Sequence, residues 1–284
     1  MSAVGAYDLR KPALLEFRGP DAVRFLNGQL TQDVRKVAGG KITLPSCVTD
    51  AKGKLQFRIR ITESPAGALW IEGPEDRAEE LEARLTRYLI ADDVEVSDLT
   101  GQFGLTHLLG PVAETPDGVV ARKSNRYGVE GTDWWMPWET DKSYELPPGF
   151  TLFFGDCGLE SLRISNGVPA WGSELAEGML PPEARLDETD ISYHKGCYIG
   201  QEVISRIKSA GKVNRRLSRF SINASVPAVP GLLVDADGAA AGELTSVSPE
   251  AVGEIRAALG YVKRGASEFF FKTEDGTMHP VMPV

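Results

Sequence analysis

The sequence predicts an α+β protein that ends in a separate all-β domain. Helical and strand periodicities alternate over the first two thirds of the chain. From about residue 213, short β-like runs such as RLSRFSI and EFFFK follow one another between turn signals, and no long helical pattern occurs. The 284 residues are enough for two compact domains or one large one. We place the boundary in the connector SAGKVNRRL, so that one domain spans residues 1-210 and a small β-barrel or sandwich spans 211-284.

The first elements follow from apolar spacing and turn residues. ALLEFRG, at 13-19, is typical of a strand. PDAVRFLNGQLTQDV, at 20-34, is typical of a helix with Pro20 in its first turn that leads into a polar turn around Thr31 to Asp33. Residues 41-62 predict a hairpin, because apolar residues alternate on both sides of a turn at Asp50 to Gly53.

The second arm of the hairpin and the elements after it show clear periodicity. Arg58 and Arg60 alternate with apolar residues, so one face of this strand is expected to be buried. PEDRAEELEARLTRYLI, at 74-90, has helical apolar spacing and an acidic first turn that suits the helix dipole. DDVEVSDL, at 92-99, predicts a further strand.

Residues 110-150 can be assigned only to strand and loop. Within them, DWWMPWE brings Trp134, Trp135 and Trp138 together. These rings either fill a core between lobes or form a flat slot for a ligand.

Composition limits the class of protein. No run of about 18 apolar residues and no signal-peptide pattern occurs, so we expect a cytoplasmic protein that does not span a membrane. Cys47, Cys157 and Cys197 are odd in number and widely spaced, which favours neither a disulfide framework nor a metal knuckle. The net charge of -9 argues against general nucleic-acid binding.

The stretch HKGCYIGQEV, at 194-203, combines reactive side chains with two glycines. The following QEVISRI predicts a helix, which would place Cys197 just ahead of a helix N-terminus and next to Lys195. Both the helix dipole and the ammonium favour the thiolate, the nucleophilic form. The alternative is that Cys197 is a buried small hydrophobe.

Other polar residues give weaker signals. The histidines lie far apart, and no metal site is predicted from them. The acids just before the motif are expected to cap or solvate the approach to it; they are Asp187, Glu188 and Asp190.

KGCYIGQEV, together with RISNGVPAWGSEL at Arg163 to Leu175 and PPEARLD between them, resembles the YgfZ family of folate-binding proteins. These are relatives of the glycine-cleavage T-protein, an aminomethyltransferase. Weaker matches in FLNGQLTQDV, GELTSVS and ALGYV extend the resemblance over most of the chain. It implies a folate-binding body of two α/β lobes and a C-terminal β-barrel that closes a ring around a central channel. Tetrahydrofolate would occupy this channel.

The resemblance also implies a site. Cys197 and Lys195 would be the reactive residues. A flat pterin needs an apolar slot and polar groups, and a glutamate tail needs cations. The residues expected to bind folate are Arg163, Trp171, Tyr193, Tyr198, Gln201, Glu202 and Arg206, with Lys195 as a further cation for the tail.

One departure from the T-protein pattern bears on function. Ser165 stands where the T-protein has a glutamate that grips the pterin. This difference favours the YgfZ branch, which is associated with assembly or repair of iron-sulfur clusters and whose partners would be iron-sulfur proteins or their assembly machinery. The alternative is a folate-dependent aminomethyl or one-carbon transferase.

A basic window spans Arg206 to Arg219 and contains no acid. It is either solvated surface, a site for the folate tail, or a contact for an acidic or RNA partner. Nucleic acid is the less favoured of these partners because the chain as a whole is acidic.

Overall fold

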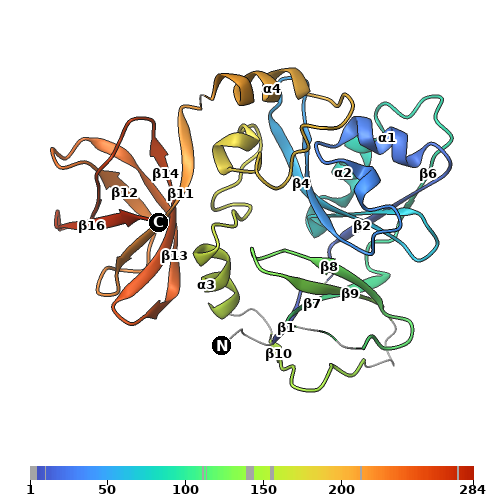
Figure 1. The fold of residues 1–284 in the computed structure, drawn as a ribbon, viewed down its shortest axis with the longest axis horizontal. Helices are drawn as coiled ribbons and strands as arrows, with labels where there is room; N and C mark the ends of the chain where they lie inside the picture. Colours follow the sequence, from blue (N-terminus) through green and yellow to red (C-terminus); the bar gives the residue numbers. More distant parts are fainter. Residues whose placement is uncertain are drawn as a thin grey trace. The chain divides into compact units, whose positions relative to one another are not determined.

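The computed structural model describes residues 5–9, 11–110, 112, 114–138, 144–153, 157–211, 213–273 and 275–284. The chain separates into two compact units (Figure 1). Unit 1 comprises residues 1–155 and 188–203, and unit 2 comprises residues 156–187 and 204–284. The domain boundary at residue 210 remains a proposal. It lies shortly before the first strand of the C-terminal barrel, which begins at Arg215.

Unit 1 contains two five-stranded sheets, of order β10-β1-β7-β9-β8 and β3-β4-β5-β2-β6. All paired neighbours are antiparallel except β1 and β10. The strands of the first sheet are β1 (Gly5–Asp8), β7 (Phe103–Leu109), β8 (Val120–Ser124), β9 (Gly131–Pro137) and β10 (Leu152–Phe153). The strands of the second sheet are β2 (Ala13–Arg18), β3 (Leu44–Thr49), β4 (Leu55–Glu63), β5 (Leu69–Gly73) and β6 (Glu95–Asp98).

Two helices form a core with one face of the second sheet. They are α1 (Ala22–Gln29) and α2 (Ala78–Thr86). The 3-10 turn η1 (Val34–Lys36) follows α1 after four residues, and η2 (Glu75–Arg77) directly precedes α2. Phe57, Ile59 and Ile61 of β4 belong to this core, which confirms the buried face predicted from their alternation. The helix predicted before the polar turn at Thr31 to Asp33 is confirmed, since α1 ends at Gln29 and Leu30 then forms an isolated β-bridge with Val48.

The opposite face of the second sheet is covered by the first sheet. Trp135 is fully buried in a cluster with Leu14, Trp70 and Leu105. Trp134 points to the other side of its own strand and is equally buried. The core interpretation is therefore confirmed for these two rings, whereas Trp138 is 54% exposed.

Unit 2 contains the helix α3 (Cys157–Ser165), the 3-10 turn η3 (Pro181–Ala184) and a closed six-stranded barrel of order β11-β14-β13-β12-β15-β16. The predicted all-β domain is thus a barrel rather than a sandwich. Its strands are β11 (Arg215–Asn223), β12 (Gly231–Val234), β13 (Ala240–Val252), β14 (Ile255–Lys263), β15 (Phe269–Lys272) and β16 (Met278–Pro283). The last helix, α4 (Gln201–Ala210), begins in unit 1 and ends in unit 2.

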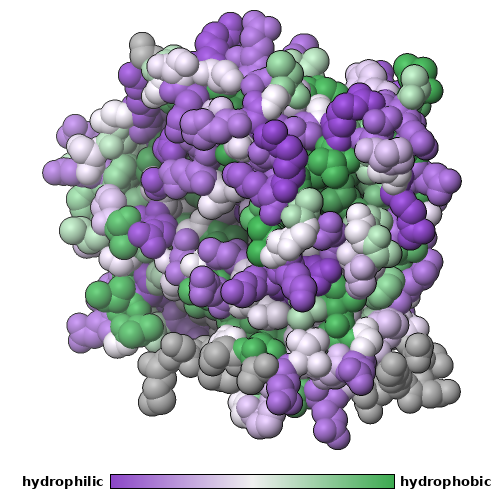
Figure 2. Space-filling view, turned by 45° about the vertical axis from the view of Figure 1, so that its right-hand side comes forward, coloured by the Kyte–Doolittle hydropathy of each residue, from purple (hydrophilic) through white to green (hydrophobic). Residues whose placement is uncertain are grey.

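The surface seen in Figure 2 is mainly hydrophilic, with smaller apolar areas between the polar ones. None of the helices in the described part of the chain has the length and apolar character needed to cross a membrane.

Candidate functional site

The cysteine motif lies in a loop of unit 1 that we call the motif loop, residues 188–200. Its first part is fixed to the second sheet by Asp190. Arg58 donates to the two carboxylate oxygens of Asp190, with Nε to Oδ2 at 2.7 Å and Nη2 to Oδ1 at 3.2 Å. Thr31 Oγ1 donates to the Asp190 backbone oxygen at 2.7 Å. Asp190 is fully buried and bound to Arg58, so it does not cap or solvate the approach to the motif as expected: it anchors the loop.

Lys195 provides the second anchor. Its Nζ donates to three backbone oxygens at and beyond the C-terminal end of α1, those of Asn27 at 2.6 Å, Leu30 at 2.5 Å and Gln32 at 2.9 Å. A helix C-terminus leaves carbonyls unpaired and carries partial negative charge, which suits an ammonium. Burial lowers the pKa of Lys195 to about 7, and nearby Asp33 opposes this shift. The ammonium is thus directed into unit 1 and ties the loop to α1.

The third anchor lies at the end of the loop. Ile199 N donates to the Gly28 oxygen at 3.2 Å, and Thr49 Oγ1 donates to the Ile199 oxygen at 2.6 Å. Gly200 has φ +87°, and a Cβ there would lie 2.5 Å from the Asp50 backbone oxygen. Only glycine fits both this backbone conformation and this close approach.

Replacing Gly200 with alanine is therefore expected to lower the free energy of unfolding by about 2 kcal/mol or more, through backbone strain and steric clash. Gly196 provides a matched control in the same loop, because a Cβ there meets no atom within 4 Å. Gly196→Ala should change stability by less than about 0.5 kcal/mol. Urea unfolding of both variants measures the difference. Equal stability of the two would show that the third anchor is not needed.

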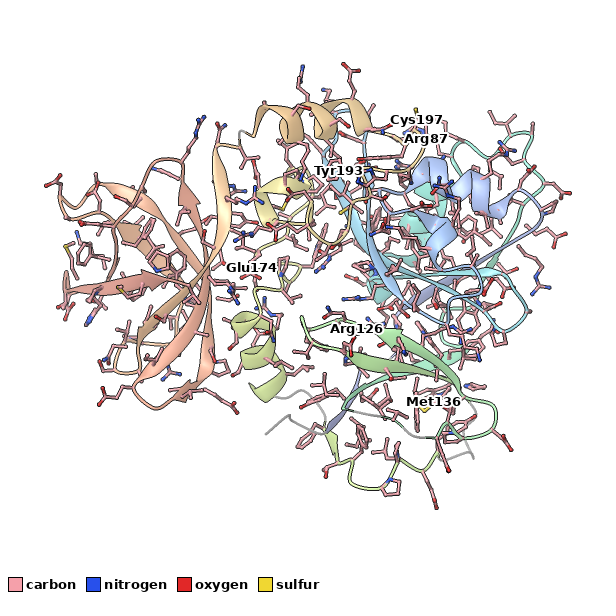
Figure 3. All side chains as sticks on the ribbon, viewed as in Figure 1. Arg87, Arg126, Met136, Glu174, Tyr193 and Cys197 are labelled. Carbon is pink, nitrogen blue, oxygen red and sulfur yellow. The ribbon has the colours of Figure 1, made fainter. Side chains whose placement is uncertain are left out.

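Cys197 lies between the second and third anchors and is exposed (Figure 3). The alternative that it is a buried small hydrophobe is therefore wrong. Cys47, in contrast, is fully buried, and burial raises the pKa of its thiol. Cys47 therefore packs in the interior of unit 1. The side chain of Cys157 lies outside the described residues.

The remaining motif residues surround this thiol in sequence. Tyr198 is 7% exposed, its ring centroid lies 5.1 Å from Lys195 Nζ, and burial raises the pKa of its phenol. Tyr193 is half-buried in the motif loop. Gln201 and Glu202 form the first turn of α4, with Glu202 exposed. Lys195 and Tyr198 thus form the buried side of the motif, and Cys197 its exposed side.

Three predicted folate residues belong to unit 2. Arg163 is 5% exposed and donates to Glu174 Oε2 at 2.8 Å and to Ser246 Oγ at 3.0 Å, and it also pairs with Glu160. Its guanidinium is therefore already engaged with protein acceptors. Trp171 is 40% exposed, and Arg206 is exposed on α4.

The basic window is partly neutralised within unit 2. Arg215 Nε lies 3.1 Å from Glu183 Oε2, and Arg216 Nη2 lies 3.6 Å from Asp187 Oδ1. Lys212 lies outside the described residues. An RNA contact through this window stays a prediction, and these ion pairs lower the charge available for it.

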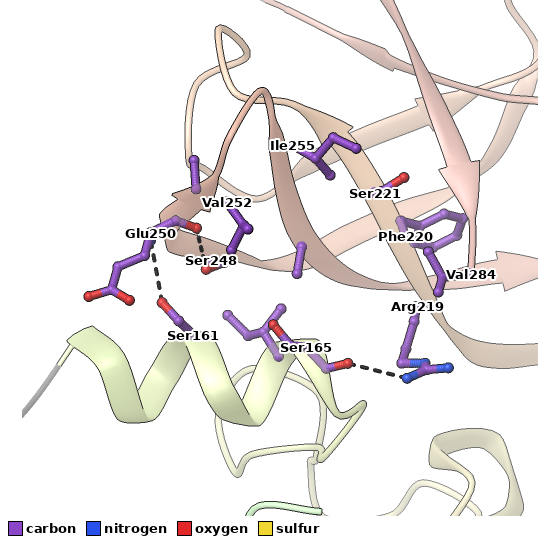
Figure 4. A pocket seen from close by; sticks show the side chains of 13 residues that line it. Ser161, Ser165, Arg219, Phe220, Ser221, Ser248, Glu250, Val252, Ile255 and Val284 are labelled. Carbon is purple, nitrogen blue, oxygen red and sulfur yellow. Dashed lines mark hydrogen bonds between the residues drawn. The ribbon is translucent and has the colours of Figure 1, made fainter. Parts of the chain in front are cut away.

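A cavity of about 230 Å³ lies in unit 2 between α3 and the barrel (Figure 4). Ser165, the residue that departs from the T-protein pattern, is part of its lining together with Ser161 and Arg219. Arg219 Nη1 donates to the Ser165 backbone oxygen at 3.3 Å. Ser165 therefore lines a cavity of unit 2, whereas the motif loop belongs to unit 1.

A buried charge network in unit 1 was not foreseen from the sequence. Arg126 (labelled in Figure 3) donates to Glu72 Oε1 and to Asp133 Oδ1, both at 2.7 Å. Asp133 Oδ1 also lies 2.7 Å from His107 Nδ1. Arg126 and His107 lower the pKa of Asp133 against the effect of burial, whereas burial lowers the pKa of His107. Arg60 lies beside this network. The alternation of Arg58 and Arg60 with apolar residues in β4 was the feature of the sequence that could have indicated this network.

Sequence comparison with known proteins agrees with the resemblance to YgfZ and the T-protein. No family model matches the chain. The tRNA-modifying protein YgfZ of Klebsiella pneumoniae is 28% identical over 235 residues, which cover 75% of this chain and 70% of that protein. An aminomethyltransferase of Rubrobacter xylanophilus is 25% identical over 268 residues, which cover 85% and 71%.

A solved structure agrees with these sequence matches. The glycine cleavage system aminomethyltransferase T from Bartonella henselae matches with a TM-score of 0.78 at 16% identity, covering 99% of this chain and 85% of that one. At this identity the match shows the fold. The chain is therefore a relative of YgfZ and of the aminomethyltransferases, with the fold of the glycine-cleavage T-protein.

Proposed function

We propose that this chain is a cytoplasmic, tetrahydrofolate-binding protein of the YgfZ type that uses Cys197 in iron-sulfur cluster assembly or repair. The observation that carries the proposal is the exposed thiol on a loop with three anchors, at Asp190, Lys195 and Ile199. A fixed and exposed thiol can meet a partner without an ordering cost, because the loop conformation is already set.

The thiol would act together with ligands from a partner. A protein-held cluster takes about four thiolates. The chain has three cysteines, and Cys47 is buried. Cys197 would therefore contact a cluster transiently, as one ligand among others supplied by an iron-sulfur protein or a small thiol. Lys195 would hold the loop, since its ammonium is bound to three carbonyls.

Two residues of unit 1 support a ligand such as tetrahydrofolate. Tyr198 Oη and Arg60 Nη1 are among the buried polar atoms that have no hydrogen-bond partner among the described residues. A pterin amide edge and a glutamate tail offer polar atoms to groups of this kind. Tyr193 and Gln201 remain our candidates for further contacts in unit 1. The contributions of Arg163, Trp171 and Arg206, and a ring with a central channel, also belong to the proposal.

Tetrahydrofolate titration tests the cofactor. Saturable quenching of tryptophan fluorescence is expected for the wild type, with affinity within about threefold for Cys197→Ala, because the thiol serves a separate step. Isothermal titration calorimetry provides a second readout that does not depend on where the tryptophans lie. A wild-type protein that binds no tetrahydrofolate at high micromolar concentration would refute the folate part of the proposal.

The alternative is a folate-dependent aminomethyl or one-carbon transferase. Relatives named aminomethyltransferase support it. Ser165 argues against it, because a serine replaces the glutamate expected to grip the pterin and cannot supply the same paired hydrogen bonds. Turnover of an aminomethyl or methyl donor in the presence of tetrahydrofolate would favour this alternative.

A further inference from the structure

We propose that Arg60 is a ligand-binding residue whose guanidinium takes an anionic oxygen, from a carboxylate or phosphate group of a small ligand. The inference rests on the proposed function only for the identity of that ligand, since the glutamate tail of a folate carries such carboxylates. The contacts that support it all lie within unit 1.

Arg60 has few protein partners for a guanidinium in this environment. It lies on β4 opposite Glu72 of β5, on the face turned away from α1 and α2. Its Nη2 donates to the Arg126 backbone oxygen at 3.5 Å, the limit of a hydrogen bond. Its Nη1 is buried without a partner, and no ion pair joins Arg60 to a carboxylate in the described part of the chain.

The acidic residues near Arg60 are paired with other arginines. Asp190 is held by two nitrogens of Arg58, while Glu72 and Asp133 are both held by Arg126. Burial and these two guanidinium groups lower the pKa of Arg60 to about 10, so it remains charged at neutral pH. Arg60 is thus a charged group in a partly desolvated position whose own donors are incompletely used.

Such an arrangement lowers stability unless something else supplies the acceptor. An unsatisfied buried donor destabilises the folded state, and more so when it is charged. Residues that break a packing rule without an internal compensation are concentrated at functional sites. Arg60 as a whole is half-buried although its Nη1 is buried, so a ligand oxygen would approach from the exposed part of the residue. Because the planar guanidinium presents paired donors, a carboxylate or phosphate is the acceptor it fits best.

The test compares Arg60→Met with Arg122→Met. Arg122 is a buried arginine of the same unit, and its nitrogens donate to the Glu63 and Ala121 backbone oxygens. Arg60→Met should unfold at the same temperature as the wild type or a higher one, and should bind tetrahydrofolate at least tenfold more weakly. Arg122→Met should unfold at a lower temperature and keep its affinity at a temperature where it is folded.

Smaller probes identify the source of the anion. If the folate tail is the ligand, p-aminobenzoylglutamate should lose affinity in Arg60→Met, and a tetrahydropterin without a carboxylate should not. If a free anion is the ligand, inorganic phosphate or citrate should raise the unfolding temperature of the wild type and not of Arg60→Met. This result together with no binding of tetrahydrofolate would support the role of Arg60 and refute the folate proposal. Unchanged responses to all probes, or a lower unfolding temperature for Arg60→Met with unchanged binding, would overturn the inference.

Discussion

Replacing Cys197 with serine should abolish the rescue of iron-sulfur enzyme activity in a strain that lacks the native protein. The hydroxyl of serine is a far weaker ligand and nucleophile than a thiolate at neutral pH. Because Cys197 is exposed, the substitution should change the free energy of unfolding by less than about 0.5 kcal/mol. The activity of a cluster-dependent enzyme in extracts is the measurement, with protein amount checked by immunoblot.

Cys47→Ala is the matched control, since it removes the other described thiol from a fully buried position. This variant should rescue activity at a temperature where it is folded. A thiol reagent should label Cys197 rapidly in the native wild type, and this labelled group should be missing in Cys197→Ser. Full rescue by Cys197→Ser would remove the thiol from the proposed function.

Replacing Lys195 with methionine should lower the free energy of unfolding by about 2–4 kcal/mol. The three carbonyls now bound by Nζ would lose a charged donor, and hydrogen bonds to charged groups are worth about 1.5–3 kcal/mol each before the gain from removing a buried charge. Hydrogen exchange at Ser192 and Ile199, whose backbone amides bond to the segment at α1, should become faster.

Lys52→Met, at an exposed turn position, controls for the loss of a lysine. It should leave both stability and exchange unchanged. If Lys195→Met instead kept its stability and slow exchange but lost thiol reactivity, Lys195 would act on the thiol and not on the loop. Chemical denaturation together with thiol labelling over a range of pH distinguishes these two roles.

Much of the local structure could be predicted from the chain alone. The alternation in β4, the Asp50 to Gly53 turn and the short C-terminal strands each depend on neighbouring residues, so spacing revealed them. Helix ends were less well predicted. The helix predicted at 74-90 is shorter in the structure, where Glu75–Arg77 form a 3-10 turn and α2 spans only Ala78–Thr86.

The candidate site divides in the same way. KGCYIGQEV identified the motif and the place of Cys197 before a helix. The sequence did not show which groups the charged side chains near Cys197 would contact. Lys195 was expected to act on the thiol or on a folate tail, yet its ammonium binds carbonyls of residues 27, 30 and 32.

The sequence by itself therefore determined the resemblance to YgfZ and the aminomethyltransferases, the order of most elements and the position of the motif loop, because these depend on residue types at short spacing. Only the tertiary structure decided which polar groups are satisfied. The polar face of β4 would be solvated on a lone sheet, but the first sheet covers the second. In this buried layer Arg58 and Arg126 pair with the nearby carboxylates, and Nη1 of Arg60 has no hydrogen-bond partner among the described residues. Burial and pairing are properties of contacts between segments far apart in the chain, and these contacts exist only after folding.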